Sequence, residues 1–152
     1  MEPIQQNARL LDIGTGAGFP GIPLKIARKD LCITLIEPVQ KKVSFLYSIV
    51  GLLRLEHVKI FYGTLEQFSM NSVLGCAYDY MTSRALRYDV MLREGRRLLG
   101  HGGRAIIYSS HVLDSQQVGG WSFVNQREFD LPRGLGHRVI SVLEQVEENP
   151  AP

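Results

Sequence analysis

The stretch Asp12-Ile13-Gly14-Thr15-Gly16-Ala17-Gly18-Phe19-Pro20-Gly21 decides the fold of this chain. It completes a short apolar run at 10–13, which is typical of a buried strand that ends in a glycine turn. Pro23 follows at a position that the first turn of a helix tolerates, and the helical pattern continues through Ala27. A strand, a glycine turn and a helix in this order predict the first unit of an open α/β sheet.

The rest of the chain continues this alternation. Short β-type runs predict strands at 31–36, 58–62, 78–82 and 104–108. A helix is expected from about 39 to 53, and its core-facing stripe would be Val43, Leu46, Tyr47, Val50 and Leu53. A further helix is expected near 86–99, where Gly100, Gly102 and Gly103 act as stop signals.

The pattern changes after the fifth strand. The runs 121–129 and 138–146 both have the composition of strands, and only the turn Leu131-Pro132-Arg133-Gly134 separates them. We therefore expect an α/β fold with a Rossmann-like, mostly parallel sheet and an antiparallel C-terminal hairpin. The order of the strands in the sheet does not follow from the sequence.

Length and composition limit the classes of protein that this chain can be. Its 152 residues predict a single domain over 1–152 with a frayed tail at 146–152. The sequence has no apolar run of 18 residues and no charged-then-apolar pattern at 1–8, so we expect neither a membrane span nor a signal peptide. Cys32 and Cys76 are isolated, which predicts small core residues in a reducing, cytoplasmic setting and no metal site.

The net charge of +2 is too small to indicate nucleic-acid binding by itself. Six arginines nevertheless gather in the segment 84–104, at positions 84, 87, 93, 96, 97 and 104. The two interpretations are a solvated helix face and a patch that contacts phosphates.

The glycine turn favours one cofactor class over another. A dinucleotide-binding GxGxxG loop would place its third glycine at position 19, where this chain has the bulky Phe19. Asp12 precedes the first of the glycines 14, 16 and 18, and its carboxylate suits a ligand with a cationic end, such as S-adenosylmethionine (SAM). Glu37, at the end of the second strand, can accept hydrogen bonds from ribose hydroxyls. The alternative is a glycine turn that only connects a strand to a helix.

The sequence resembles the bacterial RsmG family, also called GidB or glucose-inhibited division protein B. The resemblance is carried by 11–24, and above all by Gly18-Phe19-Pro20-Gly21-Ile22-Pro23. It continues through 41–46, 65–68, 83–85 and 137–140, and is weakest between 109 and 130.

Members of this family are SAM-dependent methyltransferases that modify guanosine N7 in small-subunit ribosomal RNA. The resemblance therefore implies SAM as cofactor and 16S rRNA or the small ribosomal subunit as partner. It implies cofactor contacts at Gly14 and Phe19, an adenosine contact at Leu65 and Glu66, and Arg84 beside the cofactor. The alternative for Glu66 is an ordinary solvent-facing residue of a short helix. The alternative for Arg84 is a residue that forms an ion pair on the surface.

Guanine N7 carries an in-plane lone pair and no proton, so the reaction needs no general base. Catalysis would then depend on holding N7 in line with the methyl group. We therefore assign no catalytic residue, although Arg84 is a candidate for orienting a phosphate or the O6 edge of guanine. His101, His111 and His137 are isolated in the sequence, which is typical of loop residues.

The sequence departs from the family pattern in two places. The family usually has a Lys-Gly pair around Ser109 and Ser110, and it carries several helices before the glycine-loop strand; only about seven residues precede that strand here. The explanations are a truncated protein, a shortened relative with another substrate, or a protein completed by a partner chain. Two other functions therefore stay open: a SAM methyltransferase of a small molecule, and a catalytically silent SAM-binding module.

Overall fold

The computed structural model describes residues 4–71, 77–84, 88–116 and 118–146. Its strands are β1 (Arg9–Ile13), β2 (Cys32–Glu37), β3 (Val58–Tyr62), β4 (Tyr78–Ser83), β5 (Leu99–Ser109), β6 (Trp121–Asp130) and β7 (His137–Gln145). Its helices are α1 (Gly21–Ala27), α2 (Gln40–Leu52), α3 (Leu65–Asn71) and α4 (Tyr88–Leu98), with a short 3-10 turn η1 at Pro132–Gly134.

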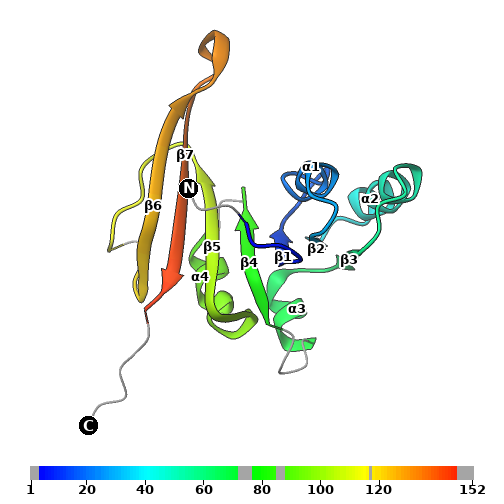
Figure 1. Cartoon of the computed structure of the whole chain (residues 1–152), viewed down its shortest axis with the longest axis horizontal. Coiled ribbons are helices and arrows are strands. Elements are labelled where there is room, and N and C mark those ends of the chain that lie inside the picture. Colours follow the sequence, from blue (N-terminus) through cyan, green and yellow to red (C-terminus); the bar gives the residue numbers. More distant parts are fainter. Residues whose placement is uncertain (1–3, 72–76, 85–87, 117, 147–152) are drawn as a thin grey trace.

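The strands form one seven-stranded sheet in the order β3-β2-β1-β4-β5-β7-β6. The first five strands pair in parallel, and β7 pairs antiparallel with both β5 and β6. This arrangement confirms the expected α/β fold with its antiparallel C-terminal hairpin. The strand order, which the sequence left open, places β1 and β4 side by side at the centre (Figure 1).

Both faces of the sheet are apolar, because successive residues of a strand point to opposite sides. Leu10 packs into one core cluster with residues of α1 and α2, whereas its neighbour Leu11 packs into a second cluster with residues of α3 and α4. Tyr80 and Met81 of β4 divide between the two clusters in the same way. The helices therefore form two layers with the sheet between them.

The start of β5 differs from the expectation. The strand begins at Leu99, directly after α4, and not at Arg104. Its register against β4 shifts between Leu99, which pairs with Tyr78, and Arg104, which pairs with Tyr80. The intervening glycines make this bulge possible, since Gly102 adopts φ +69°, a conformation that residues with a side chain rarely take. The glycines that were expected to end a helix thus form an irregular part of a strand.

Three predictions of burial were wrong. Tyr47 and Leu53 of the expected α2 stripe are 58% and 46% exposed, while Val43 and Leu46 are buried. The helix therefore presents a narrower apolar face to β2 and β3 than its sequence suggests. Cys32 is only partly buried, because it begins β2 at the rim of the sheet. Cys76 and the tail at 147–152 lie outside the described residues, as does Arg87.

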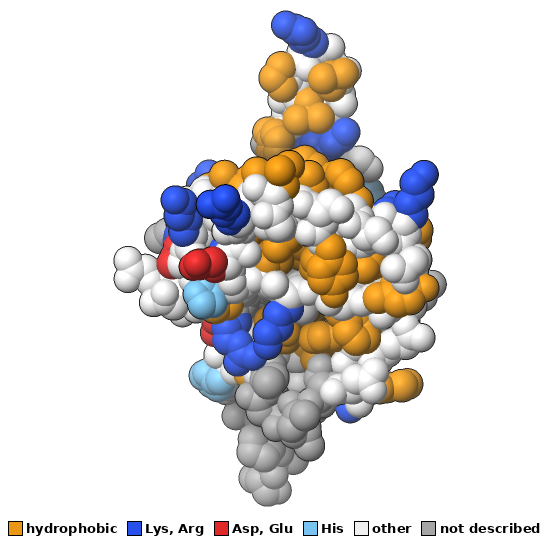
Figure 2. Space-filling view, turned by 90° about the vertical axis from the view of Figure 1, so that its right-hand side faces the viewer, with side chains coloured by type: hydrophobic (Ala, Val, Ile, Leu, Met, Phe, Trp, Pro, Cys, Tyr) orange, Lys and Arg blue, Asp and Glu red, His pale blue; other side chains and the backbone are white. Residues whose placement is uncertain are grey.

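The hairpin of β6 and β7 rises beyond the rest of the molecule (Figures 1 and 2). The pairing of β5 with β7 ends at Ser109 and Val139, so the hairpin continues past the carboxyl end of β5. Among the described residues, no helix is long and apolar enough to cross a membrane. In the same part of the chain, no group of three or more His, Cys, Asp or Glu side chains is placed to hold a metal ion.

Candidate functional site

The glycine turn lies at the carboxyl end of β1, in the middle of the sheet. Gly14 and Gly16 have φ values of +63° and +64°, which favour glycine. The backbone N–H groups of Gly18 and Phe19 both donate to the carbonyl of Thr15, at 3.0 Å each. A Cβ added at Gly16 would meet no atom within 4 Å, so the space above this residue is open to a ligand.

Asp12 holds the turn from beneath. It is fully buried, and its Oδ2 accepts hydrogen bonds from the Thr15 hydroxyl at 2.6 Å and from the Gly21 N–H at 2.8 Å. Its Oδ1 is buried without a hydrogen-bond partner among the described residues. Burial raises the pKa of Asp12 to about 6, against the lowering effect of the Thr15 and Gly21 hydrogen bonds. The carboxylate is therefore largely ionised at neutral pH.

Glu37 holds the same turn from the neighbouring strand. Its Oε2 accepts from the Gly16 N–H at 2.8 Å, and its Oε1 accepts from the Val39 N–H at 3.0 Å. The side chain is 3% exposed, with the Lys42 ammonium 4.0 Å away. Asp12 thus holds the turn at Thr15 and Gly21, and Glu37 holds it at Gly16. Both buried carboxylates accept hydrogen bonds from the same glycine turn.

Arg84 closes the turn on its outer side. It follows β4, and its Nε donates to the carbonyl of Phe19 at 3.2 Å. The guanidinium also lies over the Phe19 ring, 5.4 Å from its centroid. Phe19 itself remains 49% exposed. Among the described residues, Arg84 therefore contacts the glycine turn through both the backbone and the ring of Phe19.

Leu65 and Glu66 begin α3, beyond the carboxyl end of β3. The Gly63 N–H donates to the carbonyl of Glu37 at 3.1 Å, which brings this segment next to the end of β2. Leu65 is buried in the core cluster beneath α3, and Glu66 is partly exposed. These two residues therefore lie on the same edge of the sheet as the glycine turn.

A cleft of about 700 Å³ opens beside the turn, where strands β1, β4, β5 and β7 meet. It is lined by Gly14, Gly16, Lys42, Arg84, Tyr88, Ile107, Tyr108, Ser109, Ser110, His111, Phe129, Leu131, Arg138 and Val139. Three of these side chains are basic and none is a carboxylate. The cleft therefore suits an anionic ligand, such as a nucleic-acid backbone.

Several lining residues were not predicted as site residues. Lys42 and Tyr88 come from the starts of helices, and Phe129 and Arg138 come from the projecting hairpin. Of the arginines in 84–104 that the structure describes, Arg84 alone lines the cleft. Ligands of open α/β sheets bind at the carboxyl ends of parallel strands, and this rule points to Arg84 and Ser109. The rule does not predict that residues of an antiparallel hairpin also line the cleft.

His137 was wrongly expected to be an isolated loop residue. It begins β7, and its ring nitrogens lie 3.0 Å from Asp130 Oδ1 and 3.0 Å from Glu128 Oε2. Both carboxylates raise the pKa of His137, the Asp130 hydrogen bond most of all. The three side chains belong to the hairpin and do not line the cleft.

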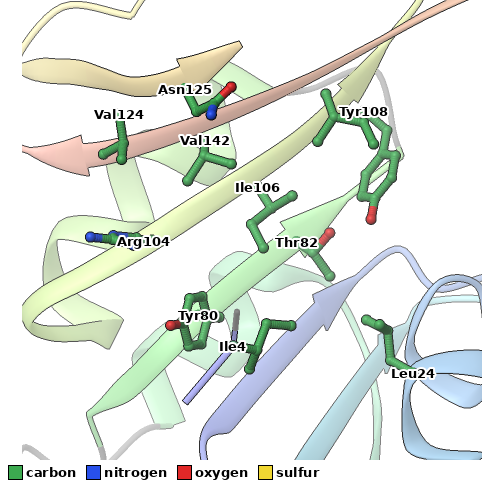
Figure 3. Close-up of a pocket in the computed structure, with 11 residues that line it drawn as sticks. Ile4, Leu24, Tyr80, Thr82, Arg104, Ile106, Tyr108, Val124, Asn125 and Val142 are labelled. Carbon is green, nitrogen blue, oxygen red and sulfur yellow. The ribbon is translucent and has the colours of Figure 1, made fainter. Parts of the chain in front are cut away.

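A second hollow, of about 370 Å³, lies on the sheet face that α1 and α2 cover only in part (Figure 3). It is lined by Ile4, Leu24, Tyr80, Thr82, Arg104, Ile106, Tyr108, Val124, Asn125, Ile140 and Val142. Most of these side chains are apolar, and Tyr108 borders both hollows. This second hollow suits an apolar group more than a phosphate.

Comparison with known proteins identifies a family that matches most of this chain. The model of the GidB family, described as rRNA small subunit methyltransferase G, matches residues 1–122. The protein named ribosomal RNA small subunit methyltransferase G from Leuconostoc citreum is 36% identical over 157 aligned positions, which cover 95% of this chain and 64% of that protein. The protein of the same name from Lactococcus lactis is 31% identical, with the same coverage of each chain. This chain thus spans less than two thirds of these relatives.

Solved structures share the fold at low sequence identity. TrmN from Thermus thermophilus has a TM-score of 0.73 at 15% identity, covering 93% of this chain and 45% of that chain. Coclaurine N-methyltransferase bound to N-methylheliamine and SAH has a TM-score of 0.68 at 15% identity, covering 84% of this chain and 47% of that chain. At such identities the likeness establishes the fold alone.

Proposed function

This chain belongs to the GidB family, and from that membership we propose that it is a SAM-dependent methyltransferase acting on guanine N7 in small-subunit ribosomal RNA. The observation that carries the proposal is the glycine turn held by Asp12 and Glu37 at the rim of a cleft whose described lining residues include no carboxylate. The glycine turn suits a nucleoside cofactor, and the basic cleft beside it suits a polyanion. A cytoplasmic location belongs to the same proposal.

The residues at the turn fit SAM. The open space above Gly16 allows a ligand to approach the backbone. We propose that Gly14, Gly16, Gly18 and Phe19 contact the cofactor, and that Leu65 and Glu66 contact its adenosine end. Glu37 would accept from the ribose hydroxyls with the lone pairs that its two N–H partners leave free. Asp12, ionised at neutral pH, would stabilise the cationic end through the turn above it.

Bound SAM supplies an electrophilic methyl group. The acceptor N7 is a nucleophile without deprotonation, so the work of the protein is to bind and orient the base. Arg84, fixed by the Phe19 carbonyl, lines the cleft, where its terminal N–H groups can donate to guanine O6 or to a phosphate. Lys42 and Arg138 add positive charge along the cleft, which attracts the RNA backbone.

Two measurements test the proposal. Calorimetric titration should detect binding of SAM and no binding of NAD, whereas binding of NAD without SAM would exclude this cofactor assignment. Incubation with methyl-labelled SAM and either protein-free 16S rRNA or 30S particles should then transfer label to the RNA. RNA binding that weakens steeply with added salt would accompany this activity.

A small-molecule acceptor is the second candidate. The apolar hollow that meets the cleft at Tyr108 favours it, because an apolar acceptor could extend from the cleft into that space. A panel of small aromatic amines and phenols in the same transfer assay separates the two functions. Label in a small molecule and none in RNA would replace the ribosomal assignment. SAM binding without transfer to any acceptor would indicate a SAM-binding module that works with a partner chain.

A further inference from the structure

The β6–β7 hairpin extends beyond the edge of the sheet at which the cleft opens. The last pair between β5 and β7 is Ser109 with Val139, while β6 and β7 continue to pair through Phe129 with Arg138 and Asp130 with His137. The hairpin tip therefore has no neighbouring strand on its β5 side. Figure 2 shows hydrophobic and basic side chains gathered on this projection.

The pairing register gives the hairpin two chemically different faces. Directly opposed residues of an antiparallel pair point to the same side, and the side alternates from each pair to the next. Arg127 pairs with Ile140 and Phe129 pairs with Arg138, so these four side chains share one face. Asp130 pairs with His137 on the opposite face, which Glu128 shares. Basic and aromatic side chains thus lie on one side, and acidic side chains on the other.

The negative charge of the acidic face is partly compensated within the hairpin. Asp130 and Glu128 contact the two ring nitrogens of His137, at 3.0 Å each. Protonation of His137, which the raised pKa favours, places a positive charge between the two carboxylates. This positive charge reduces the repulsion between the two carboxylates and an anionic ligand on the other face.

The basic face is continuous with the cleft. Phe129 and Arg138 line it together with Arg84 and Gly14, and Phe129 is 43% exposed. The Arg138 guanidinium donates to the His137 carbonyl at 2.6 Å and to the Leu135 carbonyl at 3.5 Å, which holds the side chain along the hairpin. Arg127 lies next to them on the same face and is exposed.

We propose that the face formed by Arg127, Phe129 and Arg138 binds the single-stranded RNA segment next to the acceptor base. Phe129 stacks on an unpaired base, and the two arginines contact the phosphates on either side. Proteins that bind single-stranded nucleic acids combine aromatic rings, which stack on bases, with basic side chains, which contact phosphates. The bases of an RNA duplex are stacked on one another, so they are not available to stack on Phe129. This inference rests on the proposed function, since it takes the acceptor to be RNA.

The test compares Phe129→Ala and Arg127→Gln with matched controls elsewhere on the surface. Phe45→Ala removes an aromatic ring of similar exposure, 46%, from α2, and Arg97→Gln removes an exposed arginine from α4. The affinity for protein-free 16S rRNA is measured by filter binding over a range of salt concentrations. Methyl transfer and SAM affinity are measured in parallel on the same proteins.

Phe129→Ala is expected to weaken RNA binding about tenfold, while Phe129→Tyr, which keeps the ring, retains it. Arg127→Gln is expected to weaken binding and to reduce the salt dependence by about one phosphate contact. SAM affinity should not change, and both controls should bind RNA as the unaltered chain does.

Two results would overturn the inference, and they are distinguishable. If the unaltered chain methylates RNA and both hairpin variants bind RNA with unchanged affinity, the hairpin assignment is wrong and the proposed function stands. If the unaltered chain neither binds nor methylates RNA, the proposed function fails and the hairpin assignment fails with it.

Discussion

The carboxylate of Glu37 accepts a hydrogen bond from the backbone N–H of Gly16 at 2.8 Å, which connects the end of β2 to the glycine turn after β1. Both groups are held by neighbouring strands, since β1 and β2 pair in parallel up to Ile13 and Ile36. Contacts within the chain itself therefore hold the turn in this conformation. Such preorganisation lowers the entropic cost of binding.

Replacing Glu37 by Gln tests this connection. Glutamine keeps one acceptor oxygen but presents an NH₂ group to one of the two N–H donors, so one of these backbone N–H groups loses its acceptor. The affinity for SAM, measured by calorimetry, is expected to fall about 10- to 100-fold. Glu56→Gln, at an exposed position, is the matched control and should bind SAM normally. Equal affinities for the two variants would contradict the role of Glu37.

Asp12 predicts a pH dependence of stability with a definite sign. Its pKa is raised from 3.8 to about 6, so the carboxylate binds a proton more tightly in the folded state than in the unfolded state. The stability that comes from this tighter proton binding is fully present below pH 3.8, and it is lost as the pH rises toward 6 and the folded protein loses the proton. Relative to Asp12→Asn, which has no charge at any pH, the free energy of unfolding should fall by about 3 kcal/mol over this window. Urea unfolding of both proteins at several pH values measures the difference, and a difference independent of pH would rule out the raised pKa.

Arg84 is expected to stabilise the outer side of the turn. Arg84→Ala removes the hydrogen bond to the Phe19 carbonyl and the contact with the Phe19 ring. We expect about a tenfold loss of SAM affinity, together with a larger loss of methyl transfer because the cleft also loses a cation. Arg97→Ala, at an exposed position of α4 that does not line the cleft, serves as control. Unchanged transfer by Arg84→Ala would show that this arginine has no part in the site.

His137 should titrate above its ordinary value. Hydrogen bonds to Asp130 and Glu128 raise its pKa, so the stability that it contributes is present below pH 6.5 and is lost as the pH rises through the higher value of the folded state. An NMR titration of the imidazole C–H protons gives this pKa directly. Asp130→Asn should lower it, because that carboxylate makes the larger contribution. A pKa of His137 that Asp130→Asn leaves unchanged would disprove the contact.

Much of the fold follows from the sequence, because alternating apolar runs mark strands that are buried on both faces. The strands at 10–13, 58–62 and 78–82 were predicted within one residue of their observed ends. The early part of β5 was missed, since Gly100, Gly102 and Gly103 are equally typical of a helix end and of a bulged strand. Tyr47 and Leu53 have the spacing of a core-facing helix side but are exposed. The spacing could not predict this, because it does not show how much of the helix the sheet covers.

The part of the site that neighbouring residues of the sequence form could be predicted from the sequence. The glycines 14, 16 and 18 and the carboxylates Asp12 and Glu37 come together as expected, although their roles toward a cofactor stay predictions, as does the single-domain organisation. The contributions of Phe129 and Arg138 depend on how far the hairpin passes the end of β5. That distance is set by the pairing of β7 with β5, a long-range register that the sequence does not show.

The most direct test of this account is to locate the methyl group. The unaltered chain is incubated with SAM and 30S particles, the small-subunit rRNA is treated with borohydride and aniline, which break the strand at N7-methylguanosine, and the fragments are separated by size. The account predicts SAM-dependent cleavage at one guanosine, reduced with Glu37→Gln and unaffected with Glu56→Gln. Binding of SAM without any such cleavage, in 30S particles and in protein-free 16S rRNA alike, would contradict it.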